Sequence, residues 1–337
     1  MSEQYTLKLE NFSLECGKIL PEVYFSYRTY GTYKSYETKV ILVFHALTGN
    51  SDAADWWNGI IGENMIIDPN KHFIICANFL GSCYGSTGPE SINPETGNQY
   101  HTDFPAITIG DIARQYLAIL QSLGIDKVSL GIGGSMGGMV LLELATIAPN
   151  LFEKIIPIAV GASHSAWRIA FSSVIRKTIE TFGKEFGEDG YKRGMHLARQ
   201  IAMTSYRSSI EFDGRFGRDK TEDIFEIESY LEHQGEKIVK RFSPHSYLTL
   251  TRAMELYDIS DSIGNIEAET LFIGTTSDIL YSENEIKEVA TRIPNAKYRS
   301  LDAPFGHDSF LVAQDKLAKI IRPFVITTVK QKQEIFA

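Results

Sequence analysis

The sequence predicts an α/β fold in which a mainly parallel sheet carries helices on both faces and a helical segment interrupts the sheet. Short apolar runs, mostly β-branched, alternate with helical patterns toward both ends of the chain. These runs are nearly continuous rather than alternating, which is typical of strands buried on both faces of a parallel sheet. Between residues 165 and 262 this rhythm stops, and charged, aromatic and helix-forming residues replace it.

Each element of this fold has its own signal in the sequence. The opening segment alternates in polarity and turns at Gly17, so we expect an antiparallel meander at one edge of the sheet. Amphipathic spacing predicts helices over residues 111–125, 284–294 and 310–325. The buried strands are expected at residues 39–46, 72–79, 127–134, 154–161, 269–278 and 296–304.

The chain therefore divides into three parts. Residues 1–164 and 263–337 form the two parts of the α/β core, and residues 165–262 form a helical insert. Inserts at the ligand-facing edge of such a sheet usually form lids or subunit contacts.

Composition excludes several classes of protein. The 337 residues carry a formal net charge of −9, which disfavours nucleic acid as the main partner. No apolar run reaches the roughly 18–20 residues needed to cross a bilayer, and the first ten residues are polar, so we expect a cytoplasmic location and no membrane association. The three cysteines lack C-x-x-C spacing, and the histidines lack H-x-H or H-x-x-x-H spacing, so we expect no disulfide framework and no metal.

One serine lies in a sequence context that activates nucleophiles. Ser135 is the centre of "GGSMG", which fits G-x-S-x-G directly between an expected strand and an expected helix. Such a turn is strained, with positive φ at the serine. The glycines at 133 and 137 let the backbone pass closely without Cβ clashes. Neither a Walker phosphate loop nor the dinucleotide motif G-x-G-x-x-G fits the stretch, because no G-K-[ST] follows and Met136 stands where the third glycine is needed.

A serine nucleophile needs a base and a residue that orients the base. In α/β-hydrolase chemistry the chain order is serine, acid, histidine. His307 in "DAPFGHDSFL" follows a late strand, and Asp278 in "FIGTTSDILY" follows the strand before it. Asp261, Asp302 and Asp308 are alternative acids nearby in the sequence. The amides of Met136 and Leu47, the latter in "FHALTGN", are the expected oxyanion-hole donors.

Several segments together resemble the homoserine O-acetyltransferases of methionine biosynthesis, which are acyltransferases with the α/β-hydrolase fold. They extend in order over nearly the whole chain, and the most specific are "HALTG", "GSTGP" and "GHDSFL". The others are "SDAADWWNGIIG", "FPAITIGDIARQYLAILQSLGI", "GGSMGGMVLLELA", "GMHLARQIAMTSYRS" and "FGRD".

The resemblance implies a function and further site residues. Acetyl-CoA, a co-substrate rather than a permanent cofactor, would acylate Ser135, and the L-homoserine hydroxyl would then accept the acyl group in a ping-pong reaction. Arg199 in "GMHLARQ" matches the arginine that pairs with the amino-acid carboxylate, and Asp308 matches the acid that holds the ammonium. The resemblance also implies a deep tunnel to Ser135. Tyr84 departs from the family pattern, which more often has Gln or a small residue there, and would line the acyl or CoA part of this tunnel. The insert would serve as lid and homodimer contact.

Alternative functions remain open at this stage. Relatives of this machinery use succinyl-CoA or accept serine, and a plain serine esterase needs only that water reach the acyl-enzyme. A catalytically silent binding protein is the least favoured alternative, because a binding module has no need of a serine, an acid and a histidine in this order.

Overall fold

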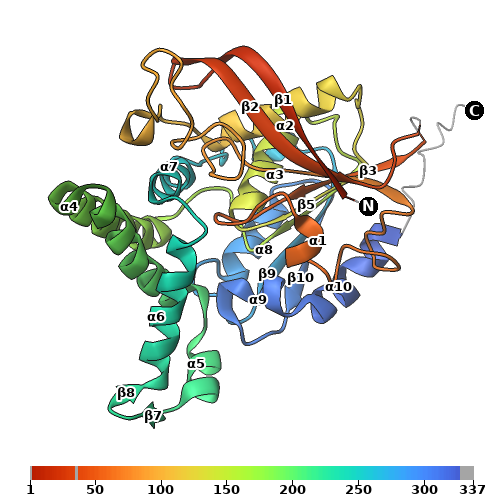
Figure 1. The fold of residues 1–337 in the computed structure, drawn as a ribbon. Helices are drawn as coiled ribbons and strands as arrows, with labels where there is room; N and C mark the ends of the chain where they lie inside the picture. The colour runs from red at the N-terminus through yellow and green to blue at the C-terminus, as the bar shows by residue number, and fades with distance from the viewer. Residues whose placement is uncertain (1, 35–36, 327–337) are drawn as a thin grey trace, which may run out of the picture.

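A computed structural model describes residues 2–34 and 37–326 and has one large mixed sheet at its centre (Figure 1). Its eight strands lie in the order β1-β2-β4-β3-β5-β6-β9-β10. β1 and β2 pair antiparallel, β2 pairs antiparallel with β4, and the remaining neighbours are parallel. The α/β prediction and the edge meander are both confirmed. The strands are β1 (Ser2–Ser13), β2 (Ile19–Tyr30), β3 (Lys39–Phe44), β4 (His72–Ala77), β5 (Leu130–Gly134), β6 (Lys154–Ile158), β9 (Glu269–Thr275) and β10 (Ala296–Leu301).

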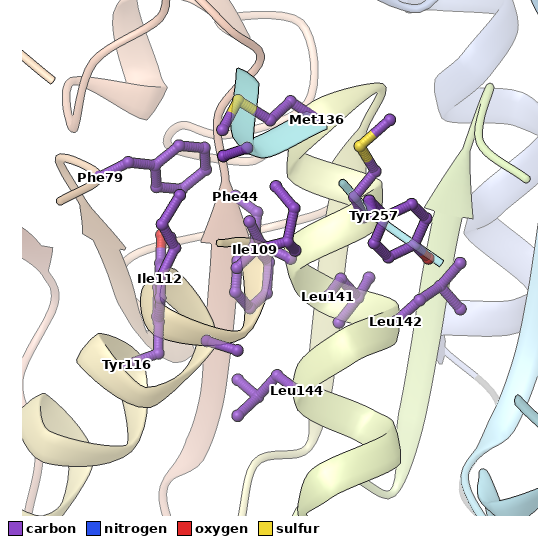
Figure 2. Packing of buried hydrophobic residues seen from close by; sticks show 14 of the residues in the cluster. Phe44, Phe79, Ile109, Ile112, Tyr116, Met136, Leu141, Leu142, Leu144 and Tyr257 are labelled. Atoms are coloured by element: carbon purple, nitrogen blue, oxygen red, sulfur yellow. The ribbon is translucent and has the colours of Figure 1, made fainter. Parts of the chain in front are cut away.

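Helices cover both faces of this sheet because both faces of the central strands are apolar. In β3, Val40, Leu42 and Phe44 point to one core cluster, while Ile41 and Val43 point to the other. The first cluster is covered by α2 (Ile109–Ser122), α3 (Met136–Ile147) and α8 (Glu283–Thr291), and Figure 2 shows its packing between α2, β3 and α3. The second is covered by α1 (Ala53–Trp56), α9 (Ser309–Val312) and α10 (Gln314–Ile326).

The residues between β6 and β9 form a helical layer beside the sheet, which we call the lid (residues 165–262). Figure 1 shows its helices on one side of the core, with α5 and the small hairpin extending farthest away. The longest helix is interrupted at Gly187, where φ is 64° and ψ is −145°. The lid contains α4 (Ala166–Tyr206), α5 (Ser209–Phe216), β7 (Lys220–Thr221), β8 (Ile224–Phe225), α6 (Glu226–Val239) and α7 (Pro244–Glu255).

The predicted element boundaries differ from the structure in two informative ways. Apolar runs expected to be strand to their ends leave the sheet early, so residues 45–46, 78–79 and 276–278 lie in loops at the carboxyl edge of the sheet. The single helix predicted over residues 310–325 is wrong, because the helix breaks at Ala313 into α9 and α10. Within residues 2–34 and 37–326, no helix is long and apolar enough to span a bilayer.

Candidate active site

Ser135 occupies a strained turn between β5 and α3. Its φ of 56° and ψ of −124° lie in a region that residues with a Cβ rarely adopt. The turn is tightly packed: a Cβ on Gly133 would lie 2.6 Å from the carbonyl oxygen of Gly137, and one on Gly137 would lie 2.2 Å from that of Phe44. Only glycine fits at these two positions, and the strand-to-helix turn expected from the sequence is present.

Ser135, Asp278 and His307 lie together at the carboxyl edge of the parallel strands. His307 Nε2 is 2.8 Å from Ser135 Oγ, and His307 Nδ1 is 2.7 Å from Asp278 Oδ2. Asp278 follows β9, and His307 lies in a short 3₁₀ turn, Gly306–Asp308, after β10. Of the alternative acids, Asp308 is the neighbour of His307 in the chain but forms its ion pair with Arg207. This arrangement has the geometry of a nucleophile, its base and an orienting carboxylate.

Burial and charge act on His307 in opposite directions. Burial lowers the pKa of His307. The carboxylate of Asp278, which accepts a hydrogen bond from the ring, and the nearby carboxylate of Asp308 both raise it. Their effect is the larger one, so the pKa of His307 is raised. The other oxygen of Asp278, Oδ1, accepts the amide hydrogens of Leu280 and Tyr281 at 2.7 and 3.1 Å. The carboxylate is therefore held from both sides, with one oxygen directed at the imidazole.

A stack of side chains that the sequence did not predict supports the imidazole. The ring of Tyr281 stacks on His307 with centroids 5.4 Å apart and an interplanar angle of 23°. The guanidinium of Arg168 lies 4.0 Å from the Tyr281 ring centroid. Arg168 is buried and fixed by two hydrogen bonds to Glu285, at 2.7 and 2.8 Å, and by the carbonyl oxygens of Ser163 and Leu280. These contacts restrict how the histidine ring can tilt.

Two amide groups near Ser135 are free to bind an anion. Leu47 lines the cavity in front of the serine, and Met136 is the first residue of α3. Within residues 2–34 and 37–326, neither amide has a protein acceptor. The start of a helix and an unpaired loop amide both favour negative charge, so these groups could stabilise a developing oxyanion.

The loop that carries Leu47, residues 45–50, is held by a histidine that the sequence analysis missed. His45 is fully buried, its Nδ1 lies 2.8 Å from the Ala46 carbonyl oxygen, and its Nε2 lies 3.3 Å from the Phe79 amide. This pattern requires a neutral ring with the proton on Nδ1. Burial lowers the pKa of His45 to about 4, consistent with a structural rather than a titrating role.

The motif "ANFLGSCYGSTGP" folds into a polar network that supports the same loop. Asn78 Oδ1 accepts the Ser51 amide at 2.7 Å, and its Nδ2 donates to the Tyr84 carbonyl oxygen at 2.6 Å. Gln115 of α2 donates to the Asn78 carbonyl oxygen at 2.7 Å and accepts from the Leu80 amide at 2.8 Å. Buried polar groups of this kind fix loop positions because each unpaired one would be costly.

Ser135 and His307 open into a cavity of about 450 Å³ between the core and the lid. Arg199 of α4 and Asp308 both line it, so the structure brings both predicted substrate-binding residues to the same space as Ser135 and His307. Arg199 lies over the ring of Tyr206, 5.5 Å from its centroid, and forms no ion pair with any described residue. Asp308 pairs with Arg207, Nε to Oδ2 at 3.1 Å, and accepts no hydrogen bond from the described chain.

The cavity lining includes both exposed and buried residues. Its exposed part, which we call the mouth, includes Lys237, Arg241 and the carboxylate of Asp55. Arg241 donates to the carbonyl oxygen of Thr48 at 2.6 Å and to the Tyr84 hydroxyl at 3.0 Å. The lid is thus tied to the 45–50 loop, and Tyr84 lines the cavity as expected. His164 also lines the cavity and is buried, and neither of its ring nitrogens has a hydrogen-bond partner among the described residues. Burial and the nearby Arg168 lower the pKa of His164 to about 4.

The sheet order, the elbow and the serine–aspartate–histidine order are those of the α/β-hydrolase class. A family profile described as the alpha/beta hydrolase fold matches residues 39–314. The homoserine O-acetyltransferase of Chlorobaculum parvum is 42% identical to this chain over 326 residues, which are 93% of this chain and 92% of that protein. The chain belongs to the homoserine O-acetyltransferase family of the α/β-hydrolase fold, and the resemblance seen in the sequence is confirmed.

Solved structures agree on the fold. The homoserine O-acetyltransferase from Bacillus anthracis superposes with a TM-score of 0.90 at 23% identity, over 98% of this chain and 99% of that one. Esterase E22 superposes with a TM-score of 0.88 at 25% identity, over 96% of this chain and all of that one. The same architecture is therefore found in an acyltransferase and in an ester hydrolase.

Proposed function

We propose that this enzyme transfers an acetyl group from acetyl-CoA to the hydroxyl of L-homoserine through an acetyl-Ser135 intermediate. The observation that carries the proposal is the shared cavity. Ser135 and His307 open into the same space as Arg199 and Asp308. A nucleophile with its base thus faces a cation and an anion, the pair of charges needed to hold the carboxylate and ammonium of an amino acid. Membership of the homoserine O-acetyltransferase family supports the choice of both substrates.

The first half-reaction forms the acyl-enzyme. His307 Nε2, 2.8 Å from Ser135 Oγ, takes the hydroxyl proton as the oxygen attacks the thioester carbonyl carbon. The carbonyl oxygen becomes an oxyanion held by the amides of Leu47 and Met136. When the carbon–sulfur bond breaks, His307 returns its proton to the departing thiolate, and Ser135 keeps the acetyl group.

The second half-reaction repeats these steps with a different nucleophile. His307 takes the proton of the homoserine hydroxyl, whose oxygen attacks the acetyl carbon, and the same two amides hold the oxyanion. Collapse of this intermediate returns the proton to Ser135 Oγ and releases O-acetyl-L-homoserine. Asp278 keeps the imidazole in the tautomer whose Nε2 is free to accept a proton, and stabilises the imidazolium that forms twice in each cycle.

The charges along the cavity support a proposed place for each substrate. Arg199, which has no competing ion pair in the described chain, is suited to the homoserine carboxylate, since a planar guanidinium binds a carboxylate through two hydrogen bonds. Asp308 retains free acceptor positions for the ammonium. Lys237 and Arg241 at the mouth would meet the negatively charged end of acetyl-CoA.

Two features of the lid support its proposed role as a cover and dimer contact. It supplies much of the cavity lining and is bonded to the 45–50 loop through Arg241. It also exposes large apolar side chains that a second copy of the chain could cover. These side chains are Trp167, Ile169, Val174, Phe186, Leu197, Ile210, Ile224 and Leu256. Sedimentation velocity at several protein concentrations tests whether a homodimer forms. The cytoplasmic location stays a prediction that cell fractionation tests.

The second candidate function is ester hydrolysis, which the similarity to esterase E22 favours. Both functions share the acyl-enzyme and differ only in what removes the acyl group. CoA release from acetyl-CoA should be fast only with homoserine present. Equal release with water alone would exclude the transferase. A matrix of acetyl- and succinyl-CoA against homoserine and serine tests the substrate pair, and we expect acetyl-CoA with homoserine to be fastest.

A further inference from the structure

Three side chains from distant parts of the chain converge outside the active-site cavity. They are His101, in the loop between β4 and α2, Glu188, directly after the break in α4, and His245, at the start of α7. One potential ligand atom from each lies within 4.8 Å of the others. Figure 1 shows α4 and α7 side by side in the lid, and the histidine from the core loop completes the group. Among the described residues, this is the one such group of three.

The hydrogen bonds fix which nitrogen of His101 carries a proton. Gln99 Nε2 donates to the Glu90 carbonyl oxygen at 3.0 Å, so the amide oxygen of Gln99 is the atom that faces His101. That oxygen lies 2.9 Å from His101 Nε2 and can only accept, so Nε2 carries the proton. In a neutral ring, Nδ1 is then a bare acceptor.

This bare nitrogen faces another acceptor. His101 Nδ1 lies 3.5 Å from Glu188 Oε1, so a lone pair and a carboxylate oxygen point at one another with no hydrogen between them. With neutral imidazoles, the two carboxylates here, Glu188 and Glu90, give the cluster two negative charges. Either a proton or a metal cation would relieve this contact.

His245 brings a second imidazole to the same carboxylate. Its ring lies nearly parallel to that of His101, with centroids 4.6 Å apart and an angle of 10°. Its Nε2 lies 3.2 Å from each oxygen of Glu188, and Oε1 is the oxygen that also faces His101. Around a tetrahedral ion with bonds of about 2.0–2.1 Å, neighbouring ligand atoms lie about 3.3 Å apart. The observed 3.2 and 3.5 Å lie on either side of that value.

The backbone supports this convergence at two unusual positions. His101 has a φ of 43°, rare for a residue with a Cβ, and Gly187 at the break in α4 has a φ of 64°. The break directs Glu188 toward the histidines instead of continuing the helix. Strain at a residue with a Cβ, such as His101, persists where the surrounding structure requires it and is common at ligand sites.

We propose that His101, Glu188 and His245 bind one divalent transition-metal ion of the zinc class, with water completing the tetrahedron. Two imidazoles and one carboxylate are a ligand set suited to zinc. The ligand atoms of His101 and His245 lie within 4.8 Å of each other, so binding one ion requires the two stacked rings to turn toward a common point. The ion would join the core loop of residues 81–104, which carries Tyr84 of the cavity lining, to both α4 and α7 of the lid. Sequence spacing concealed this site, because each ligand comes from a different segment.

The test measures metal binding directly and does not depend on acyl transfer. The full chain is dialysed against a chelator, then titrated with Zn²⁺ by calorimetry, with bound metal counted by elemental analysis. The variants are Glu188→Gln and His101→Asn, both at partly exposed positions. The matched control is Glu232→Gln, which removes a surface carboxylate 3.2 Å from His196, outside the cluster.

We expect one Zn²⁺ per chain in the parent protein and in Glu232→Gln. The affinity should fall at least about 10-fold in Glu188→Gln and His101→Asn, since loss of a direct ligand costs no less than loss of its supporting residue. Zn²⁺ should also raise the melting temperature of the parent and the control, but not that of the two variants. Absence of stoichiometric binding in the parent, or equal affinity in Glu188→Gln, would overturn the proposal.

Discussion

Replacing Asp278 with asparagine should disable the triad through one specific proton. In the structure, Asp278 Oδ1 accepts two amide hydrogens, from Leu280 and Tyr281, and Oδ2 accepts from His307 Nδ1 at 2.7 Å. In Asp278→Asn, the amide oxygen must stay with the two backbone donors, because an NH₂ there would face two N–H groups. The NH₂ group is therefore directed at His307.

This orientation reverses the tautomer of the imidazole. A donor facing Nδ1 requires Nδ1 to be a bare acceptor, so the proton of a neutral ring moves to Nε2. That nitrogen, 2.8 Å from Ser135 Oγ, can then no longer accept the serine proton. Loss of the correct tautomer in serine triads lowers kcat about 10⁴-fold, which corresponds to about 5 kcal/mol in the barrier.

The assay is steady-state CoA release with saturating homoserine, with thermal unfolding as a check that the variant folds. The matched control is Asp302→Asn, an exposed carboxylate after β10 that accepts from Thr276 at 3.3 Å and makes no contact with His307. We expect near-normal turnover in the control. A folded Asp278→Asn enzyme that retains more than a tenth of the parent kcat would refute the role of this carboxylate.

Four further predictions follow from the site and its support. Because the pKa of His307 is raised, kcat/KM should rise with pH through a midpoint above about 6.5, and a midpoint below that value would contradict the assignment. Arg199→Ala should raise the KM for homoserine about 10- to 100-fold, as expected for loss of a charged hydrogen-bonded pair, and an unchanged KM would refute its role. Burial raises the pKa of Glu143 to about 7, so stability should fall as pH rises from its ordinary value near 4.5 to 7. Glu143→Gln should therefore stabilise the protein at pH 8 by ~1–2 kcal/mol but not at pH 4, which urea unfolding at both pH values checks. Gly137→Ala should cost at least about 2 kcal/mol in the same assay, while Gly214→Ala, with open space around it, should cost little.

The sequence predicted those parts of the site that depend on short-range signals. The turn at Ser135 follows from glycines two residues to either side, and its strand and helix flank it directly. Asp278 and His307 could be found because each follows a strand, and loops after parallel strands meet at one edge of the sheet. The lid was visible as a loss of the strand–helix rhythm, since burial on two faces and burial on one require different residue patterns.

What the sequence did not predict depends on packing between distant segments. The sequence analysis assigned no role to Arg168 or Tyr281, and only the folded chain stacks them behind His307. The expected helix over residues 310–325 breaks at Ala313, next to a long-range contact of Gln314. Its side chain donates to the Trp56 carbonyl oxygen at 3.1 Å and accepts from the Gly59 amide at 2.8 Å. The helical periodicity of the sequence does not indicate such a contact.

The most direct test of the proposed function is the fate of the acyl group on Ser135. The enzyme is mixed with acetyl-CoA alone, quenched, and analysed by intact mass and peptide mapping, and a second portion receives homoserine before the quench. We expect one acetyl group on Ser135 that disappears within a turnover when homoserine is added and persists in water. An enzyme that never carries acetyl on Ser135, or loses it equally fast in water alone, would contradict an acyltransferase acting through this serine.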